Sequence, residues 1–172
     1  MATEILTMED LFVDEIRDLY DAEQQIIKAL PKMMKAAESP DLKAAFEEHL
    51  AQTQIQASRL EQIFNTLGEK SSGEKCDAMQ GLIKEGDKLV DHTDAGAVRD
   101  AGLIAAAQRV EHYEMAGYGS ARSFAQMLGH DDAAALLEET LEEEKETDEK
   151  LTDLAETMVN QRAMGQVRTG RA

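Results

Sequence analysis

Several acidic residues occupy positions that a helix would turn toward an apolar core. Glu23 lies at the centre of one apolar stripe. Further along the chain, Glu111 and Glu114 share one helical face, and Glu144 and Asp148 share another. The apolar side chains around them at helical spacing are Leu19, Ile26, Leu30, Ala107, Val110, Leu137, Leu141 and Leu151. Because residues three or four positions apart lie on the same side of a helix, these carboxylates are predicted to point at the core.

Buried carboxylates of this kind need a partner. Removing a carboxylate from water is costly, so several converging carboxylates require cations, shared protons or both. Oxygen ligands with some imidazole suit iron or manganese, and two ions bridged by carboxylates would neutralise most of the charge. The sequence therefore predicts two metal ions, iron or manganese. The alternative is a buried salt-bridge network, for which the facing stripes offer few basic partners, Arg59 among them.

The second predicted helix contributes polar rather than acidic side chains to the core. Its inward positions carry His49, Thr53 and Gln56, with Gln52 nearer the edge. A lone core histidine is commonly held by hydrogen bonds, but the converging carboxylates also make His49 a candidate metal ligand. The other histidines lie near a helix end, on an outer face or just before a helix: His92, His112 and His130.

Four long segments of helical periodicity must position these side chains. Gly68 and Gly129 are predicted to end two of them, and Ser39 followed by Pro40 is predicted to begin another. The predicted helices cover residues 8–37, 40–67, 76–90, 98–128 and 131–159. Two pairs of long helices with short turns, joined by one long connection, indicate an all-α, ferritin-like four-helix bundle whose crossover carries a short fifth helix.

Domain organisation is expected to be simple. The chain of 172 residues is long enough for one domain with a substantial core, and no composition break suggests a second. We expect the bundle to occupy residues 1–160 and a basic, flexible tail to occupy residues 161–172.

A possible internal repeat relates the two predicted pairs. When Glu47 is placed on Glu138, leucines of the second and last helices align without gaps. The same shift places Glu23 on Glu114. Helical heptads produce such matches by chance fairly often, so the repeat is a hypothesis. It predicts a pseudo-two-fold axis, and a site between the pairs would then be built twice.

Composition excludes several classes of partner. With 35 acidic and 18 basic residues, the net charge is −17, which repels nucleic acid and anionic lipid surfaces. No apolar run is long enough for a membrane span, and the first residues lack the pattern of a signal peptide. Cys76 is the only cysteine, so a reducing cytoplasm is the expected location. We also expect a homodimer, formed along an apolar strip that involves Leu11, Phe64 or Phe124.

Four segments resemble the YciE/YciF family of ferritin-like bacterial stress proteins: ALPKMMKAA (29–37), AFEEHLAQT (45–53), RDAGLIAAAQRVEHYEMAGYG (99–119) and LLEETLEEEKETDEKLTDLA (136–155). The resemblance implies a dimetal centre in a ferritin-like bundle. The residues that it supports most directly as ligands are Glu23, Glu111, Glu114 and Glu144, and its secondary candidates are His49, Gln56 and Asp148. Ferritins and rubrerythrins carry Glu-x-x-His, which this sequence lacks, so a standard ferroxidase centre is not expected.

Three functions fit these features. The first is a redox dimetal protein that oxidises ferrous iron or consumes peroxide, with Glu114 or Glu144 bridging two ions and Glu23 and Glu111 as terminal ligands. The second is a non-enzymatic dimeric bundle that acts through a protein partner in a stress response. The third is mineral storage, which requires a closed cage of many subunits.

Overall fold

The computed structural model describes residues 4–71 and 75–165, and every regular element in these ranges is helical. The five long or intermediate helices are α1 (Met8–Ala36), α2 (Pro40–Leu67), α3 (Asp77–His92), α4 (Ala97–Leu128) and α5 (Asp131–Leu154). They start at or next to the predicted residues, which confirms the all-α architecture. Within the described ranges, no helix is both long and apolar enough to cross a membrane.

Local sequence signals set the helix ends. Thr7 precedes α1 in a capping box, in which its hydroxyl accepts from the Asp10 amide and the Asp10 carboxylate accepts from the Thr7 amide. Pro40 is the first residue of α2, where an amide hydrogen would have no helical partner. Gly68 and Gly129 follow α2 and α4 with φ of 70° and 77°, left-handed conformations that glycine adopts without strain.

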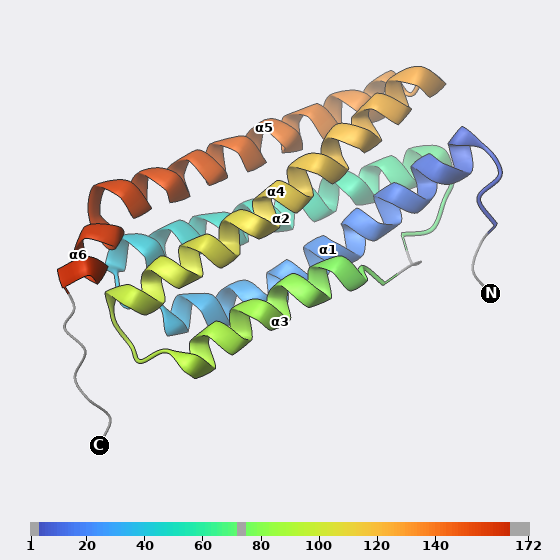
Figure 1. Cartoon of the computed structure of the whole chain (residues 1–172). Coiled ribbons are helices and arrows are strands. Elements are labelled where there is room, and N and C mark those ends of the chain that lie inside the picture. The colour runs from blue at the N-terminus through green and yellow to red at the C-terminus, as the bar shows by residue number, and fades with distance from the viewer. Residues whose placement is uncertain (1–3, 72–74, 166–172) are drawn as a thin grey trace.

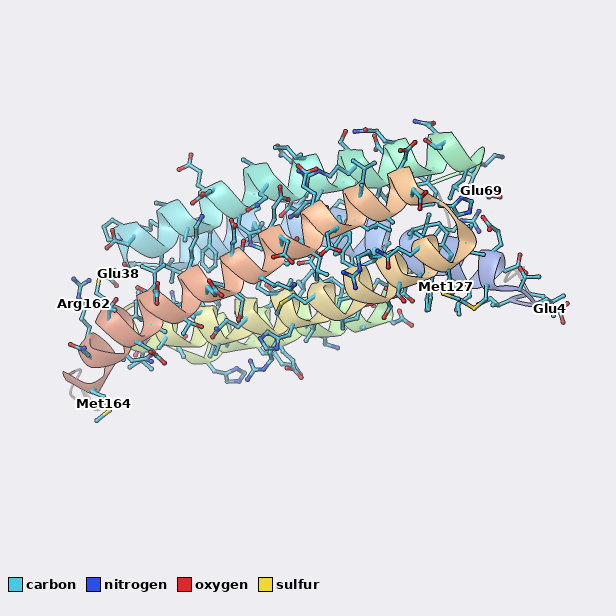
Figure 2. The ribbon with its side chains drawn as sticks, turned by 90° about the horizontal axis from the view of Figure 1, so that it is seen from above. Glu4, Glu38, Glu69, Met127, Arg162 and Met164 are labelled. Carbon is cyan, nitrogen blue, oxygen red and sulfur yellow. The ribbon has the colours of Figure 1, made fainter. Side chains whose placement is uncertain are left out.

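The long helices form two antiparallel pairs, α1 with α2 and α4 with α5 (Figure 1). Figure 2 shows Glu38, in the turn between α1 and α2, at the same end as Arg162, whereas Glu69 and Met127 lie at the other end. Because α2 ends at the opposite end from the start of α4, the connection must run the length of the bundle. Helix α3 lies along this connection and packs against α1 and α4. One long crossover between two pairs is the ferritin-like arrangement.

Asp100 ties the first turn of α4 to the turn between α1 and α2. Its side chain is buried, and its two carboxylate oxygens accept hydrogen bonds of 2.8 Å from the backbone amides of Glu38 and Ser39. Amides just before and at the start of a helix have no helical partner, so this carboxylate satisfies donors that would otherwise be unpaired. The contact fixes the second pair of helices against the first.

The core consists of two apolar clusters with a polar layer at their boundary. The cluster toward the α4–α5 turn includes Phe12, Ile16, Leu19, Leu60, Ile63, Phe64, Tyr118, Ala121 and Leu137. The cluster toward the α1–α2 turn includes Ala22, Ile26, Leu30, Leu42, Phe46, Leu103, Ala107 and Leu151. Each of the four long helices places buried polar residues at or beside the boundary, including Glu23, His49, Glu111 and Glu144. Both ends of the polar layer are therefore closed by apolar packing.

One residue of the predicted dimer strip is inside the protein. Phe64 is only 1% exposed and packs in the first apolar cluster, so its placement on a surface strip was wrong. The reason is the helical register, which puts Phe64 beside Leu60 and Ile63 on the inward side of α2. Leu11 and Phe124 are half-buried, and the homodimer stays a prediction.

The last helix differs from the predicted one. The α-helix α5 ends at Leu154, a wider π-helical turn covers Ala155–Val159, and α6 continues over Asn160–Gly165. Val159 is buried, so the wider turn keeps an apolar side chain in the core after α5 ends. Helical structure therefore extends to residue 165, into the predicted tail, and residues 166–172 lie outside the described ranges.

Candidate metal centre

Four side chains from three helices converge in the polar layer. His49 comes from α2, Glu111 and Glu114 from α4, and Glu144 from α5. Each offers one ligand atom, and these four atoms all lie within 4.8 Å of one another. Ligands about 2.0–2.2 Å from a metal ion lie at most about 4.4 Å apart, so a small side-chain adjustment would bring this set around one ion. The structure thus brings together four of the seven predicted ligands.

The converging atoms lack partners. Both carboxylate oxygens of Glu111, Glu114 and Glu144 are buried without a hydrogen-bond partner among the described residues. The same is true of Oε2 of Glu23 and of both ring nitrogens of His49. Buried polar atoms are nearly always hydrogen-bonded, so seven carboxylate oxygens and two imidazole nitrogens without partners in one place need an explanation.

Glu23 lies beside this cluster on α1 and is held by a tyrosine. The hydroxyl of Tyr118 donates a short hydrogen bond to Oε1 of Glu23, and both side chains are fully buried. Burial raises the pKa of Tyr118 well above its usual value, so the phenol keeps its proton and acts as the donor. The remaining oxygen of Glu23 stays available to a further partner.

Burial controls the charge of these groups. It raises the pKa values of Glu23, Glu111 and Glu114 well above the usual range, and the negative charge of Glu144 adds to the rise in all three. The pKa of Glu144 is raised to about 7, again mainly by burial. For His49, burial lowers the pKa to about 4, so the ring is neutral near pH 7. A neutral imidazole has a lone pair that can bind a metal ion.

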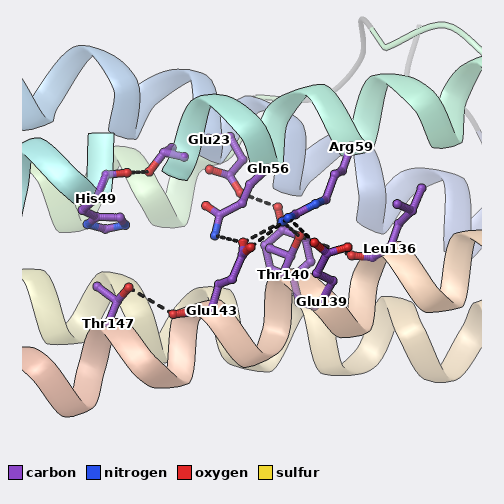
Figure 3. Close-up of polar contacts among 11 residues, drawn as sticks. Glu23, His49, Gln56, Arg59, Leu136, Glu139, Thr140, Glu143 and Thr147 are labelled. Carbon is purple, nitrogen blue, oxygen red and sulfur yellow. Dashed lines mark hydrogen bonds and ion pairs between the residues drawn. The ribbon is translucent and has the colours of Figure 1, made fainter. Parts of the chain in front are cut away.

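Gln56 and Arg59 form a polar network next to the cluster (Figure 3). The guanidinium of Arg59 donates to both oxygens of Glu143, at 2.6 and 2.8 Å, and to Glu139 at 2.6 Å. The amide nitrogen of Gln56 donates to Glu143 at 3.1 Å, while its Oε1 has no partner among the described residues. Burial by itself raises the pKa of Glu143, but hydrogen bonds from Arg59 and Gln56 hold this pKa below its usual value.

This network joins α2 to α5 through an ion pair. Glu143 is half-buried and is paired with Arg59. The sequence contained a signal for this pairing, because Arg59 is the basic residue on a facing stripe. In the structure Arg59 forms its ion pairs with Glu139 and Glu143, and within the described ranges none of the inward glutamates Glu23, Glu111, Glu114 and Glu144 forms an ion pair with it. Among the residues that the structure describes, only His49 lies within ion-pair distance of one of these glutamates, with its Nδ1 3.5 Å from Oε1 of Glu111.

Asp148 does not join the cluster. Its Oδ1 accepts a hydrogen bond from Gln108 at 3.2 Å, and its Oδ2 lies 3.4 Å from Nε2 of His112. The side chain of Asp148 is 20% exposed and that of His112 is 66% exposed, so this pair lies at the edge of the bundle. Four residues advance about 40° beyond one full turn of a helix, so Asp148 lies nearer the edge of the buried face of α5 than Glu144 does.

The donor set matches a hard or borderline metal ion. Carboxylate oxygens with one neutral imidazole suit iron, manganese or zinc better than soft, thiolate-binding metals. The unpartnered oxygens and nitrogens are the atoms that such ions would bind, and they face one another in a layer closed at both ends by apolar packing. The residues present therefore fit a metal centre.

A bundle of two antiparallel helix pairs, joined by one long crossover and enclosing buried carboxylates, belongs to the ferritin-like class of proteins. A family model described as a domain of unknown function, DUF892, matches residues 7–164. The chain belongs to this family, and it is 48% identical over 158 residues to Protein YciF from Escherichia coli strain K12. That alignment covers 91% of this chain and 95% of YciF.

Solved structures agree with this assignment. The crystal structure of the E. coli stress protein YciF matches with a TM-score of 0.87 at 47% identity, covering 91% of this chain and 99% of that one. YcfI from Rhodopseudomonas palustris matches with a TM-score of 0.85 at 47% identity, covering 88% of this chain and 97% of that one. A protein from Xanthomonas campestris pv. campestris, 22% identical with a TM-score of 0.76 over 92% of this chain and 98% of its own, shares the fold. The predicted resemblance to the YciF family is confirmed.

Proposed function

We propose that this protein binds two divalent metal ions, iron or manganese, between its two helix pairs and uses them in redox chemistry during stress. The proposed ligands are Glu23, His49, Glu111, Glu114 and Glu144, with Gln56 available through its unpartnered oxygen. The observation that carries the proposal is the group of nine buried oxygen and nitrogen atoms that have no hydrogen-bond partner among the described residues. Its link to stress rests on the description of YciF as a stress protein.

Charge balance supports two ions rather than one. Four ionised glutamates carry four negative charges, and His49 is neutral near pH 7 because burial lowers its pKa to about 4. The nearby cation Arg59 is already shared by Glu139 and Glu143. Two divalent ions would neutralise the four carboxylates in their ionised form, whereas one ion would leave two carboxyl groups either protonated or charged in an apolar core, the latter at a high desolvation cost.

The chain's own residues would prepare the centre in three ways. Tyr118 orients Glu23 by its hydrogen bond. Arg59 and Gln56 hold Glu143 on the neighbouring position of α5, which restrains the helix at Glu144. The apolar clusters on both sides exclude water. A bound pair of iron or manganese ions would supply electrons two at a time, as ferrous iron oxidation coupled to peroxide reduction requires.

A non-enzymatic function is the second candidate. The relative YcfI is described as a candidate structural protein, and the chain lacks the Glu-x-x-His motif of ferritins. In that case the inward glutamates would stay protonated in part, consistent with the rise of the Glu144 pKa to about 7. Purified protein would then contain no stoichiometric metal and would act through a protein partner.

Elemental analysis distinguishes the two functions. Protein is purified without chelator from cells supplemented with iron and manganese, beside a Glu23→Ala, Glu144→Ala double variant. The matched control is a Glu146→Ala, Glu149→Ala double variant, which removes two exposed carboxylates from α5. About two metal equivalents in the wild type and control, lost from the inward variant, would support the metal centre. Background metal in all three proteins would rule it out.

A further inference from the structure

An apolar cavity leads from the surface to the candidate metal centre. It has a volume of about 390 Å³ and lies between α1, α3 and α4. Its walls are formed mainly by apolar side chains: Ile26, Ala29, Leu30, Met33, Leu82, Ile83, Val90, Leu103, Ala107 and Val110. Its lining also includes His49 and Glu111, two members of the cluster that could hold a metal ion. The cavity therefore ends against two residues of the cluster, whose nitrogen and oxygen atoms are themselves buried.

The crossover helix creates this cavity. Within α3, Met79 near the first turn is the buried residue, whereas Leu82, Ile83, Leu89 and Val90 are only partly buried. Farther along α3, Gly86 faces Ala106 of α4, and a Cβ placed on Gly86 would lie 3.8 Å from the Ala106 Cβ. Small residues at this crossing leave space that larger side chains would fill. In Figure 1, α3 lies along α1 and α4, and its residues Leu82, Ile83 and Val90 line the cavity.

The two ends of the cavity differ in chemistry. The outer end carries exposed charged residues, Lys32, Asp87 and Asp91. The inner end carries His49 and Glu111, which are 4% and 0% exposed. The residues at each end carry a net charge that is negative or zero, and the whole chain carries a net charge of −17. A ligand with a neutral polar group and an apolar chain fits this distribution, whereas an anionic head group would be repelled at either end.

We propose that this cavity binds an organic hydroperoxide, with the alkyl chain between α1, α3 and α4 and the neutral O–O group at His49 and Glu111. The proposal rests on the proposed metal centre, for which it names the substrate class. An apolar cavity of about 150 Å³ accommodates benzene, so a volume of about 390 Å³ admits an alkyl chain of roughly eight to ten carbon atoms. The volume also lies within the range of small-molecule pockets, about 300–1,000 Å³.

The reaction is a two-electron reduction. A metal pair held by Glu23, His49, Glu111, Glu114 and Glu144 would supply two electrons, one from each divalent ion, and these would cleave the O–O bond of the hydroperoxide. Two protons from solvent complete the products, an alcohol and water. A single turnover therefore needs no reductant other than the two divalent ions.

Binding is tested first with 1-octanol, a neutral and unreactive analogue. Calorimetry on the full-length protein, with and without bound metal, compares the wild type with Ala106→Phe, which places a large ring in the cavity. The matched control is Ala105→Phe, the same substitution at the adjacent exposed position of α4. We expect Ala106→Phe to weaken 1-octanol binding at least tenfold, and Ala105→Phe to leave it unchanged. Gly86→Leu, from the opposite wall, repeats the test if Ala106→Phe does not fold.

Two results would overturn the cavity assignment: equal 1-octanol binding by the wild type and both cavity variants, or tighter binding of octanoate than of 1-octanol. The substrate class is then tested on metal-loaded protein, as the ratio of octyl hydroperoxide to hydrogen peroxide consumption. Ala106→Phe is expected to lower this ratio relative to Ala105→Phe, and an unchanged ratio would refute the substrate assignment. Metal content is measured on the same samples. Background metal in the wild type would show that the proposed metal centre fails, whereas bound metal with an unchanged ratio would show that the cavity assignment fails.

Discussion

Replacing Glu144 by glutamine should change the stability of the metal-free protein in a direction set by pH. Glu144 is fully buried, and neither of its oxygens has a hydrogen-bond partner among the described residues. The neutral amide of glutamine has nearly the same shape but cannot ionise. The substitution therefore removes the penalty for burying a negative charge and alters little else in the packing.

The magnitude follows from the pKa of Glu144, which rises from 4.5 for an exposed glutamate to about 7 in the folded protein. Below pH 4.5 the carboxyl is protonated in both states. As the pH rises from about 4.5 to 7, the unfolded chain releases its proton first, so the folded state binds more protons and stability falls. A difference of about 2.5 pH units corresponds to about 3 kcal/mol. The metal-free Glu144→Gln variant should be more stable than the wild type by about this amount at pH 8, and by less than about 1 kcal/mol at pH 5.

The assay is urea unfolding followed by circular dichroism at pH 5 and pH 8, in the presence of a chelator. Glu149→Gln, an exposed position on the same helix, is the control and should show no such pH-dependent gain. With iron or manganese added, the sign should reverse, because the amide is a weaker ligand than the carboxylate and metal binding stabilises only the folded state. A metal-free Glu144→Gln variant that is less stable than the wild type at pH 8 would refute the burial argument.

Three further predictions test the packing around the site. Gly117→Ala would place a Cβ 2.7 Å from Cδ2 of Leu19 and should destabilise the fold by about 1–3 kcal/mol. Gly119→Ala, with no neighbouring atom within 4 Å, should instead stabilise the fold by about 0.5–1 kcal/mol. Denaturant midpoints measure both effects, and equal shifts for the two variants would contradict the geometry. Asp100→Ala should lower the free energy of unfolding by about 3 kcal/mol, because it leaves two backbone amides of the α1–α2 turn unpaired. Urea unfolding measures this loss, and a loss below about 1 kcal/mol would show that the contact contributes little to stability. Burial raises the pKa of the Cys76 thiol to about 11, so a thiol reagent at pH 8 should label native protein far more slowly than protein in guanidinium chloride; equal rates would show that the thiol is accessible.

The fold could be read from the sequence because its signals are local. Gly68 and Gly129 end their helices in the left-handed conformation, and Pro40 starts α2, as predicted. The apolar periodicity fixes which face of each helix is buried, and the long connection between the pairs fixes the topology. The π-helical turn after Leu154 was not predicted, because it depends on how the end of α5 packs and not on a distinct sequence motif.

Helical periodicity predicted part of the candidate site as well. Periodicity alone places Glu23, Glu111, Glu114 and Glu144 inside, and all four are fully buried. Periodicity is less informative at the edge of a stripe, where a rotation of a few tens of degrees decides between core and solvent. Asp148 was expected inside and lies at the edge, whereas the cavity beneath α3 depends on tertiary packing that no single helix encodes.

The charge of the centre depends on which half of the chain supplies the carboxylates. The alignment that places Glu23 on Glu114 also places Thr53 on Glu144. The first of these two pairs is acidic in both halves of the chain, whereas the second is acidic only in the C-terminal half. Thr53 is buried and donates its hydroxyl to the His49 carbonyl, so α2 adds no negative charge at that position. With Glu111 the inward carboxylates number four, which is the charge of two divalent ions. If the proposed pair of metal ions is bound, a fifth carboxylate at Thr53 would leave an unbalanced negative charge in the core, so the neutral side chains of α2 would help to match the charge of the site to two divalent ions.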